Sequence, residues 1–186
     1  MALPTGDEPR QTTRCERGGG SVEALSPMTI MPVQKPGRSK QDYATPRDFL
    51  AAVKKRLGIK EFAYDLAADA SNTVAEWFLS EKENALEWEW DWSLLMGWLW
   101  LNPPFGDLTP WAAKCAIKSE RGAKIAFLVP ASVGSNWFAE YVAGKAQVIF
   151  FRPRLSFDGI APYPKDCMLC LYGPPPGYET WNWKTN

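Results

Sequence analysis

The chain contains no histidine among its 186 residues. Histidine is the commonest general base in enzymes and a frequent metal ligand, so catalysis that depends on an imidazole is excluded. Cysteine is scarce, and the CxxC pair of Cys167 and Cys170 has no second pair that would complete a zinc site. The sequence therefore predicts no metal centre, and it predicts that these thiols are buried next to a strand.

Long apolar runs are missing as well. No stretch approaches the roughly 20 residues that a membrane helix needs, and the first residues lack the continuous apolar segment of a signal peptide. With 46% hydrophobic and 23% charged residues, the composition is typical of a globular protein with a substantial core. We therefore expect a cytoplasmic protein without membrane contact.

Positive charge is nearly absent from the middle of the chain. The formal net charge is zero, yet residues 61–110 contain ten acidic residues and a single basic one, Lys82. A polyanion would therefore meet residues 54–56, the C-terminal half or residues 1–40 rather than the central segment. Alternatively, these charges are solvated surface without a partner.

Residues 1–40 differ in composition from the rest. They contain three consecutive glycines, scattered prolines and little apolar periodicity, which predicts a disordered N-terminal extension. One folded domain is expected over residues 41–186. Within it, helical and strand patterns alternate, which is typical of an α/β sheet with helices on both faces. Ligands in such sheets lie beyond the carboxyl ends of the strands.

The expected elements follow from apolar periodicity and from turn residues. Thr45 and Pro46 open a helix, with Pro46 as its first residue, and Gly58 ends it. Residues 69–79 hold a helical turn or a loop. The other helices are expected at 109–119 (capped by Thr109) and 135–142, and the strands at 61–66, 96–101, 124–129, 147–151 and, as the last one, 167–172.

Glutamate or aspartate alternates with tryptophan over residues 87–92. The period of two predicts an extended segment with its tryptophans on one side. Interleaved aromatics can bind bases, but the flanking carboxylates repel phosphate. Packing in the core or at a sheet edge is therefore the favoured interpretation.

A tetrapeptide connects the expected strand at 96–101 with the helix at 109–119: Asn102, Pro103, Pro104 and Phe105. The prolines lack a backbone N–H, so the loop is rich in acceptors. The Asn102 amide oxygen and the Pro103 carbonyl can each accept a hydrogen from an –NH₂ group, while Phe105 stacks on the ring that carries it. Two neutral acceptors would localise the nitrogen lone pair for attack on a methyl sulfonium. Alternatively, the segment is a rigid turn with Phe105 in the core.

Four stretches appear in order at 43–46 (YATP), 64–68 (YDLAA), 100–106 (WLNPPFG) and 152–157 (RPRLSF). Together they resemble the phage-type DNA N6-adenine methyltransferases over roughly residues 41–172. The resemblance implies a Rossmann-like sheet, S-adenosylmethionine as cofactor, and DNA as substrate in the cytoplasm of a bacterial host. The flipped adenine would be oriented by Asn102 and Pro103.

The same resemblance implies a set of cofactor-binding residues. Asp65 would accept hydrogen bonds from the cofactor's ammonium, and the small side chains of Ala67 and Ala68 would let the backbone approach. No glycine-rich loop follows Asp65, which departs from the usual methyltransferase pattern. Asp65 alternatively caps a helix or is solvated, and Asn72 either contacts the cofactor or caps a helix. One wall of the site would be formed by Tyr43, Thr45 and Pro46.

On the substrate side, the resemblance implies that Arg154 contacts DNA phosphate and that Phe157 holds the extruded base. Alternatively, Arg154 is a surface charge and Phe157 a core anchor. Two other functions remain open at this point. One is a methyltransferase for another amine, such as an RNA base or a protein side chain, and the other is a catalytically silent DNA-binding module.

Overall fold

The structure, a computed structural model, describes residues 44–90, 96–157 and 159–185. The extension predicted over residues 1–40 and the site residue Tyr43 lie outside this part. No helix in the described segments is long and apolar enough to cross a membrane. The elements are α1 (Arg47–Leu57), β1 (Phe62–Asp65), β2 (Ala75–Phe78), β3 (Trp98–Leu101), α2 (Thr109–Ser119), β4 (Lys124–Pro130), α3 (Asn136–Tyr141), β5 (Gln147–Arg152), β6 (Cys167–Tyr172) and β7 (Gly177–Asn182).

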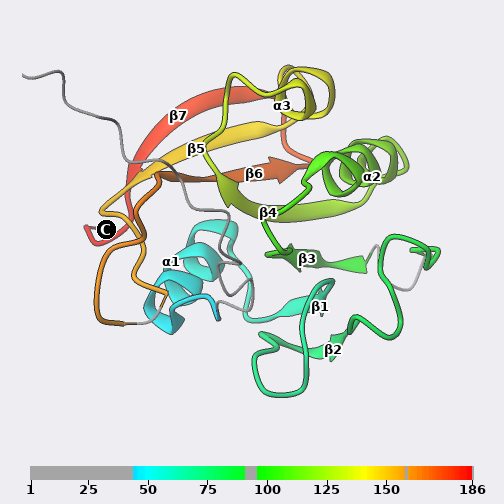
Figure 1. The fold of residues 1–186 in the computed structure, drawn as a ribbon, viewed down its shortest axis with the longest axis horizontal. Coiled ribbons are helices and arrows are strands. Elements are labelled where there is room, and N and C mark those ends of the chain that lie inside the picture. Colours follow the sequence, from blue (N-terminus) through cyan, green and yellow to red (C-terminus); the bar gives the residue numbers. More distant parts are fainter. Residues whose placement is uncertain (1–43, 91–95, 158, 186) are drawn as a thin grey trace, which may run out of the picture. The chain divides into compact units, whose positions relative to one another are not determined.

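The strands form one mixed sheet in the order β2-β1-β3-β4-β6-β5-β7 (Figure 1). The first four run parallel, β6 is antiparallel to its neighbours β4 and β5, and β7 is parallel to β5. The chain reverses its direction of travel across the sheet at β1, because β2 lies on one side of it and β3 on the other. Such a switch point leaves a crevice beyond the carboxyl ends of the strands.

Apolar side chains cover both faces of the sheet. Helices α2 and α3 pack on one face, through residues that include Cys115 and Trp137, and α1 packs on the other through Phe49 (Figure 1). Strand β3 divides its side chains in the same way, with Leu99 in the first cluster and Trp100 in the second. The prediction of a mixed α/β protein with helices on both faces is confirmed.

Helix α1 ends where the sequence predicted. Gly58 adopts φ 66°, and its N–H donates to the carbonyls of Lys54 and Lys55. Pro46, however, lies one position before the first helical residue, so its predicted place inside the helix is wrong by one residue. Its carbonyl still accepts the N–H of Leu50 at 3.0 Å.

Helix α2 has the predicted bounds but a different cap. Leu108 is the capping residue, and its side chain makes no capping hydrogen bond. The carboxylate of Asp107 instead accepts the N–H of Thr109 at 3.0 Å, so the cap predicted for Thr109 is wrong. The other predicted helices and strands agree with the structure to within two residues at each end.

Two strands were not predicted. Strand β2 occupies part of residues 69–79, where a helical turn or a loop was expected, and it lies at one edge of the sheet. Strand β7 follows residues 167–172, so the prediction that β6 is the last strand is wrong. It forms the opposite edge of the sheet and runs parallel to β5.

The tryptophan-rich segment is not a strand in its described part, residues 87–90. Trp88 and Trp90 nevertheless pack against the core while Glu87 and Glu89 are exposed, so the predicted core packing is confirmed for these two rings. The indole N–H of Trp90 donates to the carbonyl of Ala85 at 3.1 Å. Trp92 lies outside the described residues.

Candidate active site

Two polar side chains lie at the carboxyl ends of neighbouring strands. Asp65 is the last residue of β1, and Asn102 directly follows β3. Asp65 is in register with Trp100, whose carbonyl accepts the N–H of Leu66 at 2.9 Å. Both residues therefore lie at the switch point of the sheet, where the sequence placed them.

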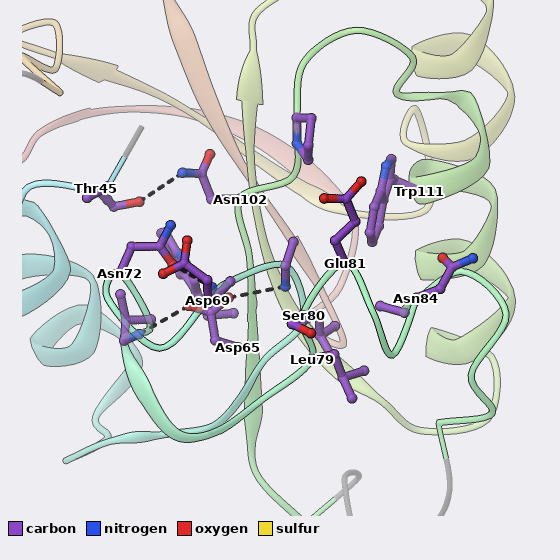
Figure 2. Close-up of a pocket in the computed structure, with 18 residues that line it drawn as sticks. Thr45, Asp65, Asp69, Asn72, Leu79, Ser80, Glu81, Asn84, Asn102 and Trp111 are labelled. Atoms are coloured by element: carbon purple, nitrogen blue, oxygen red, sulfur yellow. Dashed lines mark hydrogen bonds between the residues drawn. The ribbon is translucent and has the colours of Figure 1, made fainter. Parts of the chain in front are cut away.

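A cavity of about 650 Å³ occupies this crevice (Figure 2). Seven residues that the sequence singled out line it: Thr45, Asp65, Ala67, Ala68, Asn72, Asn102 and Pro104. Pro46, Pro103 and Phe105 are not part of its lining. The structure thus brings most of the predicted cofactor-binding residues together with Asn102.

Asp65 is a buried carboxylate with only 3% of its surface exposed. Its two oxygens accept the N–H groups of Ala67 at 3.3 Å and Val74 at 3.1 Å. Burial raises the pKa of Asp65 to about 6, against the opposing effect of these two hydrogen bonds. In the described part of the chain Asp65 forms no ion pair, so a cationic ligand in the cavity would compensate its charge.

The loop after Asp65 is shaped by side chains rather than by glycines. The carboxylate of Asp69 accepts the N–H of Ser71 at 2.7 Å, and the amide oxygen of Asn72 accepts the N–H of Asp69 at 2.8 Å. Asn72 therefore stabilises a turn instead of capping a helix, while it also lines the cavity. These local hydrogen bonds fix the loop without the backbone freedom of glycine.

The residues that follow β2 form the wall that sequence reasoning missed. Ser80, Glu81 and Asn84 line the cavity. In Figure 2, Glu81 lies with Trp111 of α2 on the side opposite Thr45 and Asn72. An acidic residue after the second strand commonly binds ribose hydroxyls in nucleotide-binding sheets. Recognition of β2 as a strand would have pointed to Glu81.

Lys114 of α2 holds this wall in place. Its ammonium donates to the carbonyls of Ala85 at 2.8 Å, Leu86 at 3.0 Å and Trp88 at 2.5 Å. It also lies over the ring of Trp90, 5.2 Å from the centroid. An irregular segment that lines the cavity is thereby attached to the helix that follows the Asn102 loop.

The amide of Asn102 is held by Thr45. Its Nδ2 donates to the hydroxyl of Thr45 at 3.2 Å (Figure 2). The Oδ1 atom of Asn102 is shielded from solvent. A hydrogen-bond donor entering the cavity would therefore reach this oxygen only after neighbouring groups have moved.

Three aromatic rings gather beyond the proline pair. Ring centroids are 6.4 Å apart for Phe105 and Phe157, 6.1 Å for Phe105 and Tyr163, and 5.4 Å for Phe157 and Tyr163, all edge to face. Tyr163 is a member that the sequence did not indicate. With Phe105, Ser132 and Lys165, it also lines a second hollow of about 230 Å³. Pro104 lines the first cavity and Phe105 the second, so the loop lies between the two.

Arg154 takes part in an ion pair within the chain. Its Nε donates to the carboxylate of Asp166 at 2.6 Å, and Nη1 donates to the carbonyl of Pro164 at 3.4 Å. These contacts connect the two ends of the segment that carries Phe157 and Tyr163. About half of the side chain, 49%, is exposed. Its predicted contact with DNA phosphate remains a prediction.

The three described cysteines behave as core residues. Cys115, Cys167 and Cys170 are buried, which confirms the prediction for the CxxC pair. Burial raises the pKa of each thiol above its ordinary value, so they are uncharged at neutral pH. The described segments hold no group of three or more histidine, cysteine or acidic side chains placed to bind a metal ion.

Comparison with known proteins points to one family. A sequence model described as DNA N-6-adenine-methyltransferase (Dam) matches residues 33–166. A protein of Escherichia phage T1 named DNA N-6-adenine-methyltransferase is 28% identical over 148 residues. The alignment covers 75% of this chain and 60% of the phage protein. No solved structure matches the chain. The family match spans most of the sequence and includes both strand ends of the site, so the chain belongs to the Dam family of DNA N-6-adenine-methyltransferases.

Proposed function

We propose that the protein transfers a methyl group from S-adenosylmethionine to N6 of adenine in DNA, within the cytoplasm of a bacterial host. The observation that carries this proposal is the shared cavity of Asp65 and Asn102, which places a buried carboxylate and an amide at one switch point. The family match and the name of the phage T1 relative support the choice of substrate.

The fold fits a Rossmann-like methyltransferase sheet. Strands β2, β1, β3 and β4 are parallel and reverse their order at β1, and helices cover both faces. The antiparallel strand β6 is the departure from an all-parallel sheet, and it lies away from the β1–β3 crevice. We propose that the methyltransferase domain comprises residues 41–186, which carry both the Asp65 and the Asn102 loops.

The cavity offers the groups that the cofactor requires. Asp65 would bind the ammonium group, since a cation there offsets the cost of burying its charge. The backbone beside Ala67 and Ala68 is accessible to a ligand, and Glu81 would accept hydrogen bonds from the ribose hydroxyls. Thr45 and Asn72 would complete the walls, and Tyr43 remains a predicted wall residue, whereas Pro46 does not line the cavity. Bound there, S-adenosylmethionine supplies an electrophilic methyl group on sulfur.

The chain's own contribution to the reaction is orientation. Asn102 Oδ1 and the Pro103 carbonyl would accept the two amine hydrogens, and Pro104 keeps the loop rigid. Phe105 would stack on the adenine ring. The amine would be held with its lone pair directed at the methyl carbon, so no general base is required before attack. The new N–C bond forms as the carbon–sulfur bond breaks, and the methylated nitrogen then loses its extra proton to water. Alignment of the two reactants then accounts for most of the rate increase.

The adenine has to leave the duplex to reach this loop, at a cost of a few kcal/mol. Phe105 and Phe157 would hold it, although their rings are edge to face in this structure. A stacked base would therefore have to displace these rings together with Tyr163. Arg154 would contact phosphate through the part of its guanidinium that does not face Asp166.

The proposal is tested by transfer of tritium from methyl-labelled S-adenosylmethionine to unmethylated DNA, RNA and protein in parallel. N6-methyladenine in the DNA alone would support it. Label in RNA or protein would keep the chemistry and replace the substrate. A protein that neither transfers label nor binds the cofactor would instead be a silent DNA-binding module.

Glu81→Gln should raise the dissociation constant for S-adenosylmethionine about tenfold. A hydrogen bond to a charged acceptor is worth roughly 1–1.5 kcal/mol more than one to a neutral acceptor, and about 1.4 kcal/mol is a factor of ten. Isothermal titration calorimetry measures the effect. Glu76→Gln is the matched control, because Glu76 is exposed on β2 and does not line the cavity. Equal affinities for the two variants would remove Glu81 from the ribose site.

Removal of residues 1–40 should leave the melting temperature and the rate of methyl transfer unchanged within about twofold. Residues 1–40 have little apolar periodicity, and the described residues from 49 onward already form apolar clusters on both faces of the sheet, so we expect the core to form without the extension. Thermal unfolding and the tritium assay provide the two measurements. A lower melting temperature would show that the extension packs against the domain.

A further inference from the structure

The contact between Thr45 and Asn102 joins two segments that are 57 residues apart in the chain. Thr45 is 7% exposed, lies just before α1 and lines the main cavity. We propose that Thr45 is a positioning residue for catalysis, which holds the Asn102 amide so that its oxygen is directed to the substrate amine. This inference rests on the proposed methylation of an exocyclic amine.

An amide side chain has a donor end and an acceptor end, and only one of them suits this substrate. An –NH₂ group offers hydrogens, so it needs Oδ1 and would be repelled by the Nδ2 hydrogens. The structure places Nδ2 on the Thr45 hydroxyl at 3.2 Å, which leaves the oxygen at the other end of the amide. A half turn of the amide about its last bond would exchange the two ends and present the wrong group.

The same hydrogen bond also strengthens the acceptor. When Nδ2 donates to Thr45, the amide is polarised, and more negative charge develops on Oδ1. An oxygen with more negative charge accepts the amine hydrogen more strongly. The hydroxyl of Thr45 therefore acts on the reacting nitrogen through Asn102 without touching it.

Thr45 is attached to a rigid part of the fold. Pro46, the next residue, has φ −55° and ψ 133°, and its carbonyl accepts the N–H of Leu50 in the first turn of α1. Phe49, Leu50 and Val53 are buried under the sheet and fix that helix. A threonine side chain has few rotamers, so its hydroxyl is held in place by both backbone and packing.

The chain offers a matched control. Thr45-Pro46 and Thr109-Pro110 are both threonine–proline pairs at the start of a helix, but Thr109 is exposed and lines neither cavity. Thr45→Val removes the hydroxyl and keeps the shape of the side chain, whereas Thr45→Ser keeps the hydroxyl. Thr109→Val removes an equivalent hydroxyl outside both cavities.

We expect Thr45→Val to lower kcat for DNA methylation by about 10- to 100-fold, the effect of a small misplacement of a reacting group. The dissociation constant for S-adenosylmethionine should change by less than about twofold. Thr45→Ser should recover most of kcat, and Thr109→Val should match the parent protein. A threonine that only forms the cofactor wall would instead change cofactor affinity with little effect on kcat, and that result would overturn the proposal.

A second measurement does not depend on activity. In ¹⁵N-labelled protein, the side-chain NH₂ signal of Asn102 should show slow hydrogen exchange that becomes fast in Thr45→Val but not in Thr45→Ser. Unchanged exchange in Thr45→Val would contradict the hydrogen bond itself. If the parent protein methylates no amine, the proposed function fails, and this comparison still decides whether Thr45 holds the Asn102 amide.

Discussion

Asn102→Ala should lower the rate of methyl transfer to DNA by about a thousandfold while the affinity for S-adenosylmethionine stays within about twofold. The substitution removes one of the two acceptors proposed for the amine, and it leaves Asp65 and the loop that follows it in place. Methyl transfer is measured as N6-methyladenine by mass spectrometry of the digested DNA, and cofactor affinity by calorimetry.

Two further variants sharpen this result. Asn102→Asp keeps an oxygen acceptor and should retain more activity than the alanine variant. Asn136→Ala removes an exposed amide at the start of α3, outside both cavities, and should behave as the parent protein. An alanine variant at position 102 with normal turnover would exclude Asn102 from the reaction.

The affinity for S-adenosylmethionine should fall about tenfold for each pH unit below about 6. Burial raises the pKa of Asp65 to about 6, so the carboxylate takes up a proton in this range and loses its attraction for the ammonium. Above pH 7 the affinity should reach a plateau. Calorimetry between pH 5 and 8 tests this, and Asp65→Asn should bind weakly with no such slope.

The same carboxylate affects the stability of the ligand-free protein in the opposite direction. The folded protein holds the Asp65 proton more tightly than the unfolded chain, whose pKa is 3.8. The contribution of Asp65 to the free energy of unfolding is therefore fully present below pH 3.8 and declines by about 3 kcal/mol as the pH rises to about 6. The free energy of unfolding is measured in urea at each pH for the parent and for Asp65→Asn. The difference between the two isolates the contribution of the Asp65 carboxyl. A constant difference between the two across this range would contradict the raised pKa.

Elements with strong local signals were predicted well from the sequence. The apolar run before Asn102 correctly predicted strand β3. Gly58 correctly predicted the end of α1, because the left-handed conformation found there favours glycine. Strand β2 was missed because it has four residues and an exposed middle, so its pattern was indistinguishable from a loop. Strand β7 alternates inward and outward side chains, but its signal follows three prolines and was not recognised.

The residues of the site fall into the same two groups. Some could be predicted from the local sequence, and others depend on contacts between distant parts of the chain. Asp65 and Asn102 could be placed together because each ends a parallel strand. Glu81 depended on recognition of β2, and Tyr163 reaches Phe105 only through the folding of a long loop. The hydrogen bond between Thr45 and Asn102 could not be predicted. The two residues are far apart in the chain, and no repeating sequence pattern indicates such a contact.

The position of β6 has a consequence for how the chain folds during its synthesis. This strand comes late in the sequence, yet it lies between β4 and β5 and bonds to both. Until residues 167–172 leave the ribosome, the apolar strand β4 has an open edge of unpaired N–H and C=O groups. At ordinary elongation rates that edge stays exposed for seconds, an interval in which pairing with another nascent chain competes with closure of the sheet.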